Sequence, residues 1–216
     1  MASESGDVLM MIVGADGKGV PAECTTDDIT FDGDDLMDDF EEGTFFEVED
    51  WDFGINVEDK DEGESAKPGT TPKTASKAKF SRWMSMALNS IGGGGKSQGD
   101  AAGGYPVELE PFSFTRFVDK ASPLLFNACS NKLSYKSAVV VKRKDIGSDY
   151  GLQTYFRIDF TDVLIISLAW DNGPVIKEKV KFICRQALIQ YKQQKADGSL
   201  GAAISGSWVR KMETKA

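Results

Sequence analysis

Apolar and polar residues alternate with a period of two along much of the chain, a pattern typical of β-strands that bury one face. The clearest example is Leu152–Phe160, where Leu, Thr, Phe, Ile and Phe at even positions are interleaved with Gln, Tyr, Arg and Asp. We predict further strands at Gly6–Gly14, Tyr135–Arg143, Val163–Trp170, Val175–Tyr191 and Ile204–Lys211. Several short strands, glycine-rich turns and no regularly alternating helices indicate a mainly β chain, an antiparallel two-sheet β-sandwich or barrel.

One predicted strand region changes its alternation part of the way along. Apolar residues fall at odd positions from Trp51 to Val57, but at even positions at Phe46 and Val48. Because a shift of one residue moves every side chain to the opposite face of a sheet, the pattern predicts a bulge or bend near Glu49–Asp50.

A short helix is predicted after Ser122, which we expect to be the N-cap, with Pro123 at the first helical position. Apolar residues then recur at the spacing of one helical face: Ala121, Leu124, Leu125, Ala128 and Cys129. We expect this helix to flank the β-structure and to pack against it.

A second helical pattern occupies Lys77–Ile91, with one apolar face that includes Phe80, Trp83, Met84 and Leu88. A helix of about four turns is marginal in water by itself, so docking of this face on another protein surface, such as a second copy, is our leading interpretation. Binding to a membrane surface and packing as core filler are the two alternatives that the sequence leaves open.

The chain of 216 residues is long enough for a single domain with a sizeable core. We treat residues 1–216 as one domain carrying two insertions in its β pattern. Residues 27–43 form an acidic loop. Residues 60–104 form a linker–helix–linker segment, because the Lys77–Ile91 pattern is bracketed by Gly-, Ser- and Pro-rich stretches.

Charge is divided unequally between the two parts of the chain. Residues 1–64 contain 22 acidic residues and two lysines, whereas residues 65–216 contain 12 acidic and 23 basic residues. Opposed charges of this kind predict complementary contacts within the fold or between copies. The candidate acidic contact residues are Asp32, Asp34, Asp35, Asp38 and Asp39.

The same acidic loop does not fit a calcium-binding EF-hand. With Asp32 at position 1, the fifth and sixth positions are Leu36 and Met37, where an oxygen ligand and a glycine are required. A solvated acidic loop, or one that meets a basic surface, is the better interpretation, and we expect no metal site.

Several functional classes are disfavoured by what the sequence contains. The stretch SIGGGGKSQGD resembles a phosphate-binding loop, but Ser90 stands where its first glycine is required, and no strand-to-helix context surrounds it. The chain has no histidine, which removes the commonest general base, and the paired carboxylates Glu108/Glu110 and Asp159/Asp162 have no companion that marks a catalytic site. We therefore expect no enzyme activity and no cofactor.

Other global features point to a protein that folds in the cytosol. The three cysteines are widely spaced without a C-x-x-C motif, so we expect reduced thiols. No apolar run is long enough to span a bilayer, and no standard signal peptide is evident, so we expect no stable membrane insertion. The pI near 4.7 disfavours a nucleic-acid partner.

Three stretches together resemble one known family, the Hcp (haemolysin-coregulated) tube proteins of type VI secretion systems. They are FSFTRFVDKASPLLFNACSN (Phe112–Asn131), IDFTDVLIISLAW (Ile158–Trp170) and YKQQKADGSLGAAISGSWVRK (Tyr191–Lys211). The family's helix signature is matched here at Asp119, Ser122, Pro123, Leu125 and Cys129, among others. The acidic loop and the 60–104 segment are longer than the family's usual connections.

The resemblance implies a β-barrel with a flanking helix that forms rings of six, which stack into a hollow tube. It further implies a tube that sits inside a contractile sheath on a baseplate, carries a spike protein at its tip and takes effector cargo in its lumen. Such a subunit is cytoplasmic before firing and is then secreted to the extracellular space or a target cell. The alternatives are a ring-shaped effector chaperone that does not polymerise and a tail-tube protein of another contractile injection system.

Overall fold

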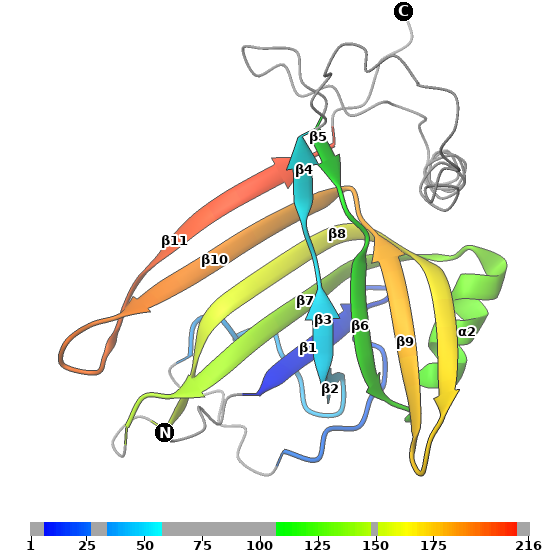
Figure 1. Cartoon of the computed structure of the whole chain (residues 1–216), viewed down its shortest axis with the longest axis horizontal. Helices are drawn as coiled ribbons and strands as arrows, with labels where there is room; N and C mark the ends of the chain where they lie inside the picture. The colour runs from blue at the N-terminus through cyan, green and yellow to red at the C-terminus, as the bar shows by residue number, and fades with distance from the viewer. Residues whose placement is uncertain (1–6, 27–33, 58–106, 148–150, 211–216) are drawn as a thin grey trace, which may run out of the picture. The chain divides into compact units, whose positions relative to one another are not determined.

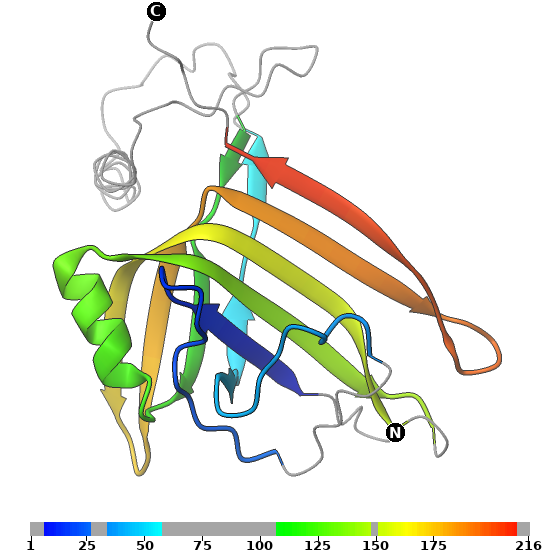
Figure 2. The ribbon, with the colours of Figure 1, turned by 180° about the vertical axis from the view of Figure 1, so that it is seen from behind.

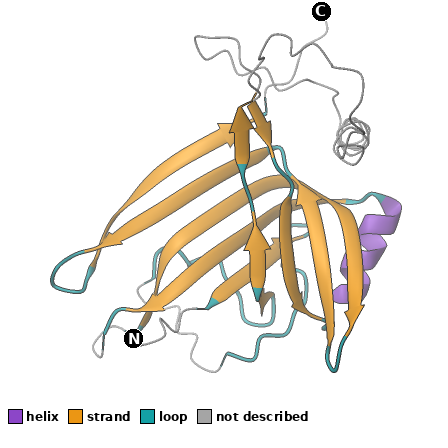
Figure 3. Ribbon diagram, in the orientation of Figure 1, coloured by secondary structure: helices purple, strands orange, loops and turns teal. Residues whose placement is uncertain are grey.

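The computed structural model describes residues 7–26, 34–57, 107–147 and 151–210. The chain divides into two compact units, the first comprising Met1–Asp52 and Pro111–Val209 and the second Phe53–Glu110 and Arg210–Ala216. The predicted 60–104 linker–helix–linker segment lies outside the described residues. The mainly β class with antiparallel pairing and one flanking helix is confirmed (Figure 3).

The first unit is built on one nine-stranded antiparallel sheet (Figure 1). Its strands are β1 (Val8–Val13), β2 (Phe45–Glu47), β3 (Asp50–Asp52), β6 (Phe112–Phe117), β7 (Ser134–Asp145), β8 (Leu152–Asn172), β9 (Ile176–Ile183), β10 (Gln186–Gln194) and β11 (Leu200–Val209). The order is β2-β1-β7-β8-β9-β6-β3, and β10 pairs with both β8 and β11.

Strand β8 is a 21-residue strand that pairs with β7, β9 and β10. Two of our predicted strand boundaries, in β8 and in the segment that follows it, are wrong. Leu152–Phe160 and Val163–Trp170 are not separate strands but parts of one strand of 21 residues that continues through Asp162, a non-glycine residue at φ 54°. The first part of β8 pairs with β7 and β10, and the second part pairs with β9. Conversely, the single predicted strand Val175–Tyr191 is two strands, since β9 ends at Ile183 and β10 begins at Gln186.

The predicted bend near Glu49–Asp50 is confirmed. β2 pairs with β1, whereas β3 pairs with β6. Two consecutive amides make the change: Val48 N–H donates to the Val8 carbonyl at 2.8 Å, and Glu49 N–H donates to the Thr115 carbonyl at 2.9 Å. The chain therefore crosses from one part of the sheet to another within two residues.

Aromatic side chains form much of the first unit's core. Phe112 on β6 lies 5.0 Å from Phe160 on β8, measured between ring centroids, and 5.0 Å from Phe182 on β9. Trp51 on the edge strand β3 stacks on Phe156 of β8 at 6.1 Å. Because β3 stands at the end of the strand order, this contact shows that the sheet curls so that its two parts pack face to face, as in a barrel or sandwich.

Helix α2 (Ser122–Asn131) packs against β8 (Figure 2). Leu125 and Ala128 are buried as predicted, but Leu124 is exposed, so the buried face is narrower than the sequence pattern suggested. The prediction of Ser122 as N-cap is wrong: Ser122 is the first helical residue, and Ala121 occupies the cap position without a side-chain hydrogen bond. The Ser122 hydroxyl instead forms hydrogen bonds with the buried Arg116 and Glu178 side chains.

The described part of the second unit is a pair of antiparallel strands, β4 (Ile55–Val57) and β5 (Val107–Leu109). The Asn56 amide donates to Glu110 Oε1 at 2.6 Å beside this ribbon. Across the described residues of both units, no helix is long and apolar enough to cross a bilayer.

Candidate functional site

A buried ionic network joins helix α2 to the sheet, and Arg116 is its centre. The Arg116 guanidinium is 1% exposed and donates from Nε to Glu178 Oε1 at 2.6 Å. Its Nη2 donates to Asp119 Oδ1 at 2.5 Å and to Ser122 Oγ at 3.1 Å, while the group lies 4.0 Å from the centroid of the Phe46 ring. Buried charges require such compensation, so this network holds β6, β9 and α2 in one arrangement.

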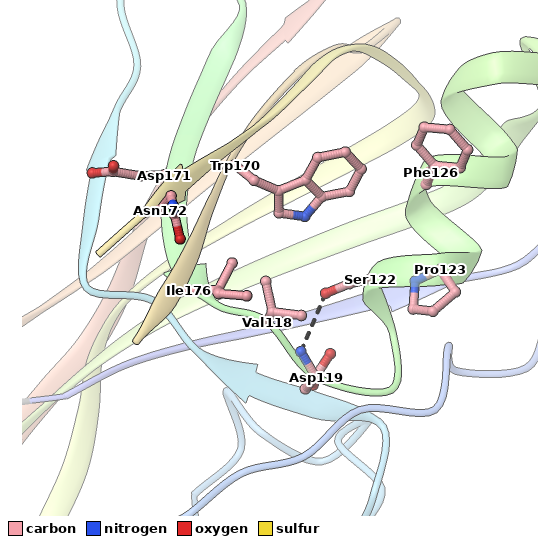
Figure 4. Close-up of a pocket in the computed structure, with 9 residues that line it drawn as sticks. All are labelled: Val118, Asp119, Ser122, Pro123, Phe126, Trp170, Asp171, Asn172 and Ile176. Atoms are coloured by element: carbon pink, nitrogen blue, oxygen red, sulfur yellow. Dashed lines mark hydrogen bonds between the residues drawn. The ribbon is translucent and has the colours of Figure 1, made fainter. Parts of the chain in front are cut away.

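The Asp119 carboxylate binds two backbone amides, one of them at the start of helix α2. Its Oδ1 accepts a hydrogen bond from the Ala121 amide at 2.7 Å, and its Oδ2 accepts one from the Glu23 amide at 2.8 Å. The Asp119 amide in turn donates to Ser122 Oγ at 3.2 Å (Figure 4). The carboxylate thus binds the amide of Ala121, the N-cap residue, and it also binds the loop at Glu23.

The other signature residues of the helix differ in how deeply they are buried. Leu125 is fully buried, Pro123 lies at the exposed start of α2, and Cys129 is half-buried, with its thiol pKa raised by burial. Ser122 Oγ donates to Glu178 Oε1 at 2.9 Å. The contacts assign Asp119 and Ser122 to a structural network and show no substrate-binding arrangement around them.

Sequence reasoning missed Glu178, which is 0% exposed. It lies directly across from Arg116 in the pairing of β6 with β9. A signal was present in the stretch KEKVKF, where Glu178 occupies the same parity as the inward-facing Val180 and Phe182. A charge at an inward position of an alternating strand calls for a buried partner of opposite charge.

The described part of the acidic segment is packed against the sheet and is not a solvated loop. Leu36, Met37 and Phe40 are buried, and the last two join a core cluster with Leu9 of β1 and Val139 of β7. The segment therefore covers part of the β1–β7 surface with its apolar residues, and three of its carboxylates bind groups of the same chain around that contact.

Three of the five predicted acidic contact residues bind groups of their own chain. Buried Asp34 accepts the Thr154 amide at 2.8 Å, Asp35 pairs with Lys192, and Asp39 pairs with Arg157. Asp38 is exposed, and Asp32 lies outside the described residues. Asp35 and Asp39 thus bind basic residues of their own chain, while the predicted contact of this loop with another subunit stays a prediction.

Arg157 lies between two carboxylates, those of Asp39 and Asp159. Burial alone would lower the Arg157 pKa, but the hydrogen bonds and charges of both aspartates raise it. For Asp39, burial alone would raise the pKa, and the guanidinium outweighs that effect and holds the pKa below its usual value. Asp159 therefore has a structural partner, and Asp162 has another in Arg185 at 3.3 Å.

An apolar groove of about 500 Å³ opens between the start of α2 and the β8–β9 hairpin (Figure 4). Figure 4 shows Trp170 of β8 and Phe126 of α2 among the lining residues, with Ile176 and Val118 beside each other. Asp119, Ser122, Pro123, Asp171 and Asn172 complete the lining. The exposed apolar side chains of this lining are typical of a protein-binding surface.

Among the described residues, no three carboxylate or cysteine side chains are grouped closely enough to hold a metal ion. The predicted docking residues Phe80, Trp83, Met84 and Leu88 lie outside the described part of the chain.

Comparison with known proteins gives consistent matches. The family model described as "Type VI secretion system effector, Hcp" matches residues 62–193, more than half of the chain. Protein hcp1 of Pseudomonas aeruginosa is 30% identical over 106 residues, covering 47% of this chain and 64% of that protein's length. The match therefore spans slightly less than two thirds of that relative.

Solved structures share the fold at low sequence identity. A structure described as a type six secretion system protein has a TM-score of 0.60 at 16% identity, covering 97% of this chain and all of its own. Hcp1 from Escherichia coli EAEC 042 gives 0.57 at 14% identity, covering 95% and 99% of the two chains. Hcp1 from Salmonella typhimurium gives 0.54 at 18% identity, covering 95% of each chain.

Proposed function

Because the chain belongs to the Hcp family of type VI secretion proteins, we propose that it is a structural subunit of the inner tube of such a system. Six copies form a ring, and rings stack into a hollow tube that is expelled when the surrounding sheath contracts. The observation that carries this proposal is the family match over residues 62–193.

The geometry of the sheet supports ring formation. β11 is a ten-residue strand that pairs with β10 along one side, and within the described residues no strand of the chain pairs with its other side. Most of its residues are exposed, including Ile204 at 69%. Long exposed edges favour association, and head-to-tail contacts between identical copies close into rings.

The remaining parts of the proposal follow from a tube of this kind. The partners are the chain itself, a spike protein, sheath and baseplate proteins, and effector cargo in the lumen. The subunit resides in the cytoplasm before firing and is delivered to the extracellular space or a target cell. No step of this function requires catalysis or a bound cofactor.

The test is size-exclusion chromatography of the full chain followed by negative-stain electron microscopy. We expect six-membered rings, alone or stacked. Ile204→Lys should weaken ring formation because it places a charge on the exposed edge strand. The matched control Gln193→Lys adds the same charge to an exposed position of β10 and should leave rings intact.

Each outcome bears on the proposal. A monomer over a wide concentration range would contradict it. Rings that never stack, with effectors bound, would favour an effector chaperone instead. Sheath and baseplate genes of another contractile particle beside this chain's own gene would favour a tail tube of that particle.

A further inference from the structure

We propose that the apolar groove between α2 and the β8–β9 hairpin binds the apolar face of segment Lys77–Ile91 from a second copy of the chain. The inference rests on the proposed assembly, because that assembly brings copies together. It assigns an acceptor surface to the amphipathic segment that distinguishes this chain from the usual family pattern.

The groove has the character of a protein-binding surface. Phe126, Trp170 and Ile176 are each exposed by about half, at 52%, 50% and 51%. The Phe126 and Trp170 rings lie 5.6 Å apart, so they form one continuous apolar wall and are not scattered surface residues. Clustered apolar side chains of this kind mark interaction sites, and buried aromatic anchors dominate binding energy at interfaces.

The Lys77–Ile91 segment has the matching apolar chemistry. Phe80, Trp83, Met84 and Leu88 recur at spacings of three and four, which is how an amphipathic helix presents anchors to a groove. The other stretches outside the described residues are at most seven residues long. The segment is therefore the best apolar occupant that this chain offers.

Charge favours the same pairing. The groove lining contains one exposed acidic residue, Asp171, and no basic residue, and its other acid, Asp119, is already paired with Arg116. Residues 65–99 contain six basic residues and no acidic one, and three of these bases, Lys77, Lys79 and Arg82, lie in the first part of the apolar segment. Opposite potentials across an interface guide association and set its orientation.

The length of chain that precedes the segment permits contact with a neighbouring copy. Twenty-three residues lead from Val57, where β4 ends, to Phe80, and they span up to roughly 75–80 Å when extended. A domain of about 150 residues has a radius of gyration near 15 Å. The segment can thus reach well beyond its own domain.

Photo-crosslinking in the full chain tests this inference. Phe126→p-benzoylphenylalanine places a photoreactive group in the groove, and Leu124→p-benzoylphenylalanine places it on an exposed part of α2 that does not line the groove. After irradiation, we expect the Phe126 probe to yield a product of twice the chain mass on a denaturing gel. Peptide mapping should locate the link within residues 77–91, and the Leu124 probe should not give this product.

A change in the segment provides the second measurement. Trp83→Ser with Leu88→Ser removes two anchors and should lower the interchain yield about tenfold. The matched control, Ser85→Asn with Asn89→Ser, alters the same segment away from the apolar face and should leave the yield unchanged.

The outcomes separate this inference from the proposed function. Rings without a link to residues 77–91 would overturn the inference and leave the tube proposal standing. A link within one chain would also overturn it, since the occupant would then not be a second copy. An interchain link to residues 77–91 supports the inference even where rings are absent, whereas absent rings count against the tube itself.

Discussion

The Arg157 guanidinium binds both carboxylate oxygens of Asp39, with distances of 2.6 Å for Nη1–Oδ1 and 2.8 Å for Nη2–Oδ2. Arg157 Nη1 also donates to the Leu36 carbonyl at 2.7 Å. The acidic segment is therefore attached to β8 through both its side chains and its backbone. Some acidic residues of the N-terminal part of the chain therefore form ion pairs within the fold, with basic residues of the sheet.

Neutralising Asp39 should destabilise the chain in a pH-dependent manner. The folded-state pKa of Asp39 is lowered, so its stabilising contribution is present above the unfolded pKa near 4 and is lost as pH falls further. Because Asp39 is 47% exposed, we expect Asp39→Asn to reduce the free energy of unfolding by only about 0.5–1 kcal/mol at pH 7. Urea unfolding at several pH values measures this difference, which should shrink as pH falls through the lowered folded-state pKa of Asp39.

The exposed neighbour Asp38 supplies the control, since no ion pair is found for it among the described residues. Asp38→Asn changes the net charge equally but should leave stability at pH 7 nearly unaltered. Equal effects of the two variants would show that the Arg157 pair contributes nothing specific.

Glu178→Gln should be far more damaging than its conservative size suggests. Glu178 is 0% exposed and is the acceptor for Arg116 Nε, so its neutralisation leaves a buried guanidinium with one carboxylate partner fewer. We expect a loss of about 3 kcal/mol in the free energy of unfolding, measured by urea denaturation. Lys179→Gln, a single-charge change at the adjacent exposed position, should cost less than about 0.5 kcal/mol. Similar small losses for both variants would refute a structural role for the network.

Tyr135 should ionise late in an alkaline titration. Burial raises the pKa of its hydroxyl to about 12, and the hydroxyl donates to the Leu124 carbonyl at 3.4 Å. Because the unfolded pKa is near 10, its contribution to stability is present below pH 10 and falls as pH rises toward 12. Ultraviolet difference spectroscopy should show a late tyrosinate step that Tyr135→Phe removes. The exposed-site variant Tyr191→Phe should retain that step.

The strands that sequence patterns predicted best are those with one buried face. In Leu152–Phe160 the even residues Thr154, Ile158 and Phe160 are buried, as the alternation requires. The pattern fails from Val163 to Ile166, where four consecutive residues are buried. Helix α2 packs against β8, and burial on both faces of a strand removes the alternation that separates one strand from the next.

The polar contacts could be anticipated only in part. Opposed charge predicted that acidic and basic groups would meet, but not that Asp34 would bond the Thr154 amide 120 residues away. The helix signature contained Asp119 and Ser122, while their partner Glu178 comes from a strand paired only in the folded sheet. The composition shows which charged residues the chain contains. The pairing of strands that are distant in the sequence determines which of these residues become neighbours.

Salt should shorten the assembled tube if the acidic segment contributes to contacts between subunits. Asp38, Glu41 and Glu42 are exposed, and no ion pair is found for them within the described part of the chain, so they are the acids of this loop best placed to meet a basic surface of another copy. Exposed charges are screened over about 10 Å at 0.1 M salt. We therefore expect mean tube length, measured by electron microscopy, to fall as salt rises from about 0.05 M to about 0.5 M.

A triple variant isolates the cause of that salt effect. Asp38→Asn with Glu41→Gln and Glu42→Gln removes the three exposed charges and leaves the Asp39–Arg157 pair intact. Its tubes should already be short at low salt and should change little as salt is added. Rings of normal size in this variant would show that the subunit itself is undamaged. Tubes that ignore salt in the unmodified chain, or that keep full salt dependence in the variant, would assign stacking to other contacts.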